Sequence, residues 1–152
     1  MKTFYSENHK LRDANTELYG DELVKPFERP QRLDFIVEEI KKRDLGEILK
    51  PNKIDLKIIN KVHDHDYIKF LDSAWNEWVK EGFKGEAIPT VWPSRSMNSD
   101  KIPTFIEGKL GYYCLAGETS ISYGSIEAAY EAVRVSIAAV DILLNENLSG
   151  IF

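Results

Sequence analysis

The end of the chain is the feature that most constrains the fold. Residues 125–144 carry apolar side chains at helical spacing along one stripe, formed by Ile126, Tyr130, Val133, Ile137, Val140 and Leu144. A polar turn follows over 145–150, and the apolar pair Ile151 and Phe152 comes directly after it. An apolar run that follows a helix and a turn is typical of the start of a buried strand in a parallel sheet. The sequence therefore predicts the front part of a larger α/β domain.

Composition and charge exclude several classes of protein. A chain of 152 residues fits one domain, and its net charge of −5 lacks the excess of Lys and Arg that nucleic-acid binding requires. Cationic partners such as small polyamines stay open. The single cysteine, Cys114, excludes an internal disulfide framework and a Cys-rich zinc site. The N-terminus has no apolar signal-peptide core, and no stretch approaches the roughly 20 apolar residues of a membrane span. We therefore expect a cytoplasmic protein that binds neither nucleic acid nor membrane.

Two long segments without periodicity separate the regular elements that the sequence predicts. Helices are expected at 30–43, at 54–80 in two pieces, and at 125–144, with short strands at 2–6 and 45–49. Asp64 or Asp66 is expected to cap the second piece of the 54–80 helix. Residues 7–30 and 83–118 read as irregular, and long loops in compact domains are usually functional or disordered.

The run His63-Asp64-His65-Asp66 is a candidate metal site. Imidazoles two positions apart do not share a helical face, but on a loop or strand both could bind one metal ion. His9 is the only other histidine, and no cysteine cluster supports such a site. The simpler interpretation, which we favour, is a helix junction in which His63 packs and an aspartate caps.

Carboxylates in the irregular segments are the more informative candidates. Glu17 lies in the run Thr16 to Gly20 (TELYG), and Glu107 and Glu118 flank the glycine- and tyrosine-rich run 108–117. Carboxylates beside aromatic rings suit a cation, because negative charge and ring faces both attract it. The alternative is that each carboxylate is a solvated surface acid or an acid at the start of a helix.

Four stretches of the sequence resemble a known family. They are FYSENHKLRDANTELYGDELVKPFERPQR (4–32), KVHDHDYIKFLDSAWNEW (61–78), GFKGEAI (82–88) and IPTFIEGKLGYYCLAGETSIS (102–122). The chain resembles the N-terminal part of acetylpolyamine amidohydrolases, members of the zinc-dependent histone deacetylase superfamily. The TELYG and IEGKLGYYC segments are the ones most specific to the polyamine branch.

The resemblance implies a fold and a division of the chain. It implies the N-terminal part of a three-layer α/β/α arginase/deacetylase-type domain, truncated, helix-rich and with few parallel strands. Residues 1–152 would be an incomplete segment of that single domain, and 83–118 a long loop insertion for dimerisation and substrate recognition. In the family, the zinc ligands, a histidine pair and a tyrosine lie beyond the strand that Ile151 would begin. We therefore expect no catalytic residue, no metal ligand and no bound zinc in this chain.

The resemblance also implies roles for specific residues. Glu17 and Tyr19 would line the substrate tunnel, and Glu107 and Glu118 would lie on the insertion that crosses a dimer interface and attracts the ammonium groups of a polyamine. The expected function is that of an N-terminal fragment of a zinc-dependent amidohydrolase acting on acetylpolyamines or acetyl-lysine-like amines. The fragment would be inactive alone and would form a homo-oligomer. The alternatives are a non-catalytic dimerisation module and, less favoured, a metal-binding protein that uses His63 and His65.

Overall fold

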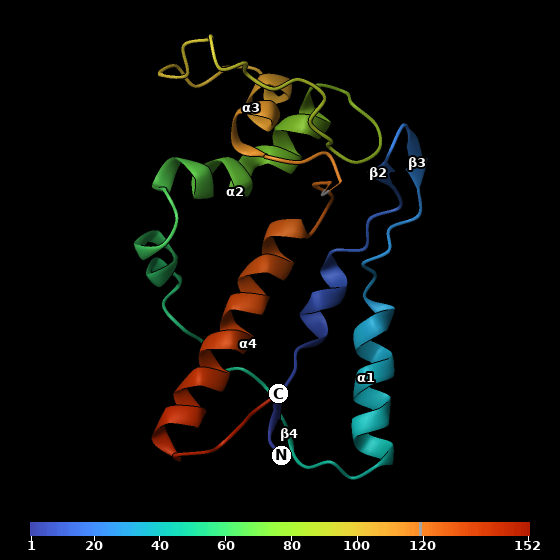
Figure 1. Cartoon of the computed structure of the whole chain (residues 1–152), viewed down its shortest axis with the longest axis vertical. Coiled ribbons are helices and arrows are strands. Elements are labelled where there is room, and N and C mark those ends of the chain that lie inside the picture. Colours follow the sequence, from blue (N-terminus) through green and yellow to red (C-terminus); the bar gives the residue numbers. More distant parts are fainter. Residues whose placement is uncertain (119) are drawn as a thin grey trace. The chain divides into compact units, whose positions relative to one another are not determined.

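The structure of the chain is a computed structural model that describes residues 1–118 and 120–152. The chain forms two compact units, each of which brings together segments far apart in the sequence (Figure 1). Unit 1 contains Met1–Arg12, Glu28–Leu56 and Gly124–Phe152, and unit 2 contains Asp13–Phe27 and Lys57–Tyr123. No helix in the described part of the chain has the length and apolar character needed to cross a membrane.

Unit 1 is built around a short parallel sheet. Strand β1 (Thr3–Phe4) pairs with β4 (Ile48–Leu49), with Thr3 opposite Ile48. On the opposite side of β1, the Phe4 N–H donates to Phe152 O at 2.8 Å, and the Phe152 N–H donates to Lys2 O at 3.1 Å. These two bonds follow the parallel pattern, so β1 has a neighbour on each side. Both expected strands are confirmed, although shorter than expected, and the apolar pair 151–152 does lead into the sheet.

Two helices and a 3₁₀ helix complete unit 1. Helix α1 (Gln31–Lys42) buries Val37 and Ile40, and helix α4 (Ser125–Asn145) packs against β1 and against the 3₁₀ helix η1 (Glu7–Leu11). Both helices confirm the predicted ranges to within two residues.

The face that α4 buries differs from the predicted stripe. Glu131 and Ala138 are the buried residues of the helix, whereas Val140 and Leu144 of the predicted stripe are 51% and 73% exposed. The helix carries apolar side chains on most of its surface, so periodicity alone does not single out the packed face.

Unit 2 is a helical unit with one apolar core. Its α2 (His65–Lys80) and α3 (Ile106–Tyr113) pack together around buried Phe70, Ala74, Ala87, Ile106 and Leu110. The Asp64 carboxylate accepts the N–H of Asp66 at 2.8 Å, which confirms Asp64 as the cap of α2. The first piece of the expected 54–80 helix is instead a 3₁₀ helix, η2 (Leu56–Lys61).

The two segments read as irregular both contain regular structure. The 83–118 segment contains α3, and the 7–30 segment contains η1 and an antiparallel hairpin of β2 (Glu17–Tyr19) and β3 (Glu22–Val24). Glycine is a poor helix former, so Gly108 and Gly111 lower the helix propensity of this stretch and the sequence does not predict α3. Gly111 lies directly against the carbonyl of Val91, where a Cβ would overlap that oxygen. Tertiary packing therefore overrides propensity here.

Candidate functional site

The β2–β3 hairpin of unit 2 positions Glu17 and Tyr19. Residues two apart in a strand point to the same face, and here both contact Phe27. The Glu17 carboxylate accepts the Phe27 N–H at 3.2 Å, and the Tyr19 and Phe27 rings meet edge to face with centroids 5.6 Å apart. Tyr19 and Phe27 are 64% and 65% exposed. The hairpin and Phe27, which follows β3 by three residues, thus bring a carboxylate and two aromatic rings together.

Glu86 fixes the residues that lead into this hairpin. One carboxylate oxygen, Oε1, accepts the backbone N–H of Asn15 at 2.7 Å and its side-chain amide at 3.2 Å. The other, Oε2, accepts the Thr16 hydroxyl at 2.6 Å. Partial burial alone would raise the pKa of Glu86, but the hydrogen bonds from Thr16 and Asn15 outweigh it and hold the pKa below its usual value. The side chain is therefore an ionised anchor.

The segment around Glu118 lies against the same hairpin. The Ser120 hydroxyl donates to the Thr16 carbonyl at 3.2 Å, and Gly117 lies where a Cβ would meet the Leu18 side chain at 3.2 Å. Ala87 and Ile121 exchange two backbone hydrogen bonds of 2.8 and 3.0 Å. Glu118 itself is exposed. The structure therefore brings together the segments that carry Glu17, Tyr19 and Glu118.

Glu107 lies elsewhere in unit 2. It occupies the first turn of α3, where a carboxylate is favourable near the positive end of the helix dipole, and it is exposed. The next turn of α3 is tied to α2 by an ion pair between Lys109 and Glu77 at 2.6 Å. Glu107 thus belongs to the helical part of unit 2. It does not belong to the hairpin cluster, the name used below for Glu17, Tyr19 and Phe27 together with the Glu118 segment.

The His63–Asp66 run forms a helix junction. The His63 ring packs against Tyr67 with centroids 5.9 Å apart, and Asp64 caps α2. Among residues 1–118 and 120–152, no group of three or more His, Cys, Asp or Glu side chains is placed to hold a metal ion. The zinc implied by the family resemblance therefore has no set of ligands in the described part of the chain.

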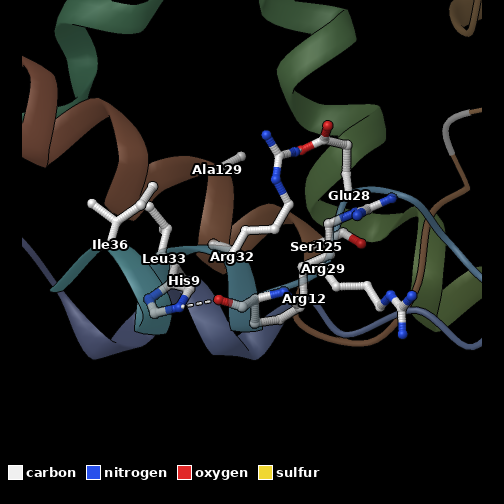
Figure 2. A pocket seen from close by; sticks show the side chains of 11 residues that line it. His9, Arg12, Glu28, Arg29, Arg32, Leu33, Ile36, Ser125 and Ala129 are labelled. Atoms are coloured by element: carbon white, nitrogen blue, oxygen red, sulfur yellow. Dashed lines mark hydrogen bonds and ion pairs between the residues drawn. The ribbon is translucent and has the colours of Figure 1, made fainter. Parts of the chain in front are cut away.

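A cavity of about 450 Å³ lies in unit 1, and its chemistry does not suit a cation (Figure 2). Three arginines line it, Arg12, Arg29 and Arg32, and its single carboxylate, Glu28, is paired with Arg32. His9 also lines the cavity. Its Nδ1 lies 2.8 Å from the carbonyl oxygen of Ser6, and its Nε2 lies 3.2 Å from the carbonyl oxygen of Pro30. None of the four predicted site residues lines this cavity.

Comparison with known proteins shows the family. Residues 26–152 match the histone deacetylase domain, and the chain belongs to that family. It is 46% identical over 143 residues to the acetylpolyamine amidohydrolase of Mycoplana ramosa, covering 94% of this chain and 42% of that protein. It is 34% identical to acetylpolyamine amidohydrolase 1 of Pseudomonas aeruginosa, covering 91% of this chain and 40% of that protein. The chain thus spans about two-fifths of the length of the relatives it matches.

A solved structure shows the same fold. The acetylpolyamine aminohydrolase of Burkholderia pseudomallei superimposes with a TM-score of 0.83 at 21% sequence identity, over 94% of this chain and 41% of that one. The match confirms the predicted arginase/deacetylase-type α/β fold. The few short strands and many helices fit the part of that fold that the chain covers.

Proposed function

We propose that this chain is the substrate-recognition part of a zinc-dependent amidohydrolase that removes the acetyl group from acetylpolyamines or similar acetylated amines. The observation that carries the proposal is the cluster in unit 2, where Glu17, Tyr19 and Phe27 lie together and the Glu118 segment contacts the neighbouring residues Thr16 and Leu18. The names of the M. ramosa and P. aeruginosa relatives support the substrate class.

The cluster suits a protonated amine for two physical reasons. A carboxylate attracts the ammonium group directly, and aromatic ring faces add a cation–π contribution of about 0.5–1 kcal/mol at exposed sites. The arginine-lined cavity of unit 1 would repel the same group. Glu17 and Tyr19 are therefore proposed to bind the amine end of the substrate, with Glu107 and Glu118 adding negative charge along the 83–118 insertion.

The test compares the 152-residue chain with the complete protein that carries it. We expect the complete protein with zinc to release acetate from an acetylated polyamine, and the chain alone to release none above a zinc-only blank. The reason is that the described residues hold no set of metal ligands. Activity of the chain alone, if abolished by a chelator, would contradict the proposed division of roles, and an inactive complete protein would contradict the proposed activity.

One observation favours the alternative, a dimerisation module. The 83–118 segment exposes several large apolar side chains, among them Val91, Phe105 and Leu115, and burying them between two copies of the chain would favour association. An inactive complete protein whose chain sediments as a dimer would select this alternative. Homo-oligomer formation and a cytoplasmic location stay predictions.

Replacing Glu107 by glutamine tests the acids of the insertion. In the complete protein, Glu107→Gln should lower kcat/KM for an acetylated polyamine by about two- to five-fold, because an exposed charge pair contributes little more than this. The loss should shrink in 0.5 M salt, which screens exposed charges, and a neutral acetylated amide should be unaffected. An equal loss on both substrates would make Glu107 a residue of the α3 N-terminus only.

A further inference from the structure

The structure assigns Glu86 as a positioning residue that sets the preference of the hairpin cluster for cationic substrates. This inference rests on the proposed function. Glu86 itself does not face the substrate, because both of its carboxylate oxygens are occupied by donors from Asn15 and Thr16. Glu86 therefore affects substrate preference only through the residues that it holds in place, Asn15 and Thr16.

The first residue that it holds in place is Glu17. Asn15 and Thr16 come directly before Glu17, and Glu86 binds a backbone N–H and a hydroxyl in those two residues. On its other side, the Glu17 carboxylate is fixed by the Phe27 N–H. Glu17 is therefore held both through the preceding backbone and through its own side chain. A carboxylate fixed in advance binds an ammonium group at a lower cost in conformational entropy than a mobile one.

Glu86 also links the hairpin to the segment that carries Glu118. The next residue, Ala87, is fully buried and pairs with Ile121 through two backbone hydrogen bonds. Thr16 connects the same pieces, since its hydroxyl donates to Glu86 and its carbonyl accepts the Ser120 hydroxyl. Three stretches of unit 2 thus meet at Glu86 and Thr16. The relative placement of the Glu17 and Glu118 segments depends on this junction.

The hydrogen bonds at this junction are of the stronger kind. An ionised carboxylate accepts hydrogen bonds that are shorter and roughly twice as strong as neutral ones, and the lowered pKa of Glu86 agrees with that state. Removing the charge would leave the Asn15 N–H and the Thr16 hydroxyl with a weaker partner. The hairpin would keep its β2–β3 ladder, whereas its entry segment would gain freedom.

The experiment uses the complete protein and two substrates, an acetylated polyamine and a neutral acetylated amide of similar size. Glu86→Gln keeps the shape but replaces one acceptor oxygen by an amide group. We expect KM for the cationic substrate to rise about tenfold, with kcat unchanged within twofold, and both constants for the neutral substrate to stay unchanged. Thr16→Val, which replaces only the hydroxyl by a methyl group, should give a smaller change of the same kind.

The double variant and a matched control decide between positioning and general damage. Because Glu86 and Thr16 share one hydrogen bond, Glu86→Gln with Thr16→Val should lose less than the product of the two single effects. Glu81→Gln, an exposed carboxylate at the end of α2, should leave the ratio of the two substrates unchanged. Thermal unfolding of each variant, measured in parallel, identifies any variant that fails to fold.

Three outcomes would overturn the inference, and the third of them would overturn the proposed function as well. Equal losses of activity on both substrates would make Glu86 a structural residue. If both single variants keep the wild-type preference for the cationic substrate, the junction of Glu86 and Thr16 does not set that preference. A wild-type protein without activity on acetylated polyamines would instead overturn the proposed function, and the inference would fall with it.

Discussion

Replacing Leu110 by alanine is expected to lower the free energy of unfolding of unit 2 by about 2–5 kcal/mol. Leu110 is 1% exposed and lies on α3 among Phe70, Ala74 and Ala87, the centre of the apolar core. The substitution removes three buried carbon atoms and leaves a cavity, because rigid neighbours on α2 relax only in part. Urea-induced unfolding, followed by tryptophan fluorescence, measures the change.

Leu115 provides the matched control for this prediction. It is also a leucine, five positions further along the chain, but it is 96% exposed. Leu115→Ala should change the free energy of unfolding by less than about 0.5 kcal/mol. If both substitutions cost the same, α3 does not pack into the core in the way the structure places it.

Replacing Gly124 by alanine is the second substitution with a large expected effect. Gly124 precedes α4 with φ = +76°, and a Cβ there would overlap the carbonyl oxygen of Leu11 at the end of η1. An alanine pays about 1–2 kcal/mol for the left-handed conformation, and the overlap adds about 1–3 kcal/mol as the helix is forced outward. We therefore expect unit 1 to lose about 2–5 kcal/mol of unfolding free energy, measured by circular dichroism during urea unfolding.

The substitution Gly82→Ala separates the cost of the left-handed conformation from the cost of the overlap. Gly82 has φ = +85°, but a Cβ at this position would meet no atom within 4 Å. Gly82→Ala should therefore show only the conformational cost of about 1–2 kcal/mol. A Gly124→Ala variant no less stable than Gly82→Ala would contradict the close approach of α4 and η1.

The sequence predicted those elements whose signals are local and strong. The helices α1 and α4 follow apolar periodicity, and the Asp64 cap of α2 follows from a side chain that bonds the backbone two residues on. The strands β1 and β4 were expected because short apolar runs lie next to turns. These features depend on residues close to each other in the chain.

Elements that depend on distant contacts were missed. Helix α3 contains two glycines and forms against the core of unit 2, so its local pattern was weak. The buried face of α4 includes Glu131, which hydrophobic periodicity cannot select. Partial burial would raise the pKa of this carboxyl, but Ser6, Arg134 and Asn8 hold the pKa below its usual value. A buried charge of this kind is tolerated because it is paired, here with Arg134 on the same helix and with Ser6 and Asn8 from a distant part of the chain.

The candidate site was predicted only in part for the same reason. Glu17 and Glu118 follow from the pattern of acids in irregular segments and Tyr19 from the family resemblance, and the structure places their segments in contact. Phe27 and Glu86 were missed, since their roles come from contacts 8 to 71 positions away in sequence, as in the pairs of Phe27 with Tyr19 and Glu86 with Asn15. Nothing in the run GFKGEAI marks its glutamate as an anchor.

The double pairing of β1 has a consequence for the order in which the chain folds during synthesis. Ile48, the partner of Thr3 in β4, follows it by 45 positions, and Phe152, which bonds Lys2 and Phe4 on the other side of β1, follows Thr3 by 149 positions. The segments of unit 2 are complete at Tyr123, before α4 has been made. Proteins are made from the N-terminus at about 5–20 residues per second, so the second neighbour of β1 is made about 7–30 s after β1 itself. Unit 2 can therefore form on the nascent chain, whereas the sheet of unit 1 closes only after Phe152 has been added.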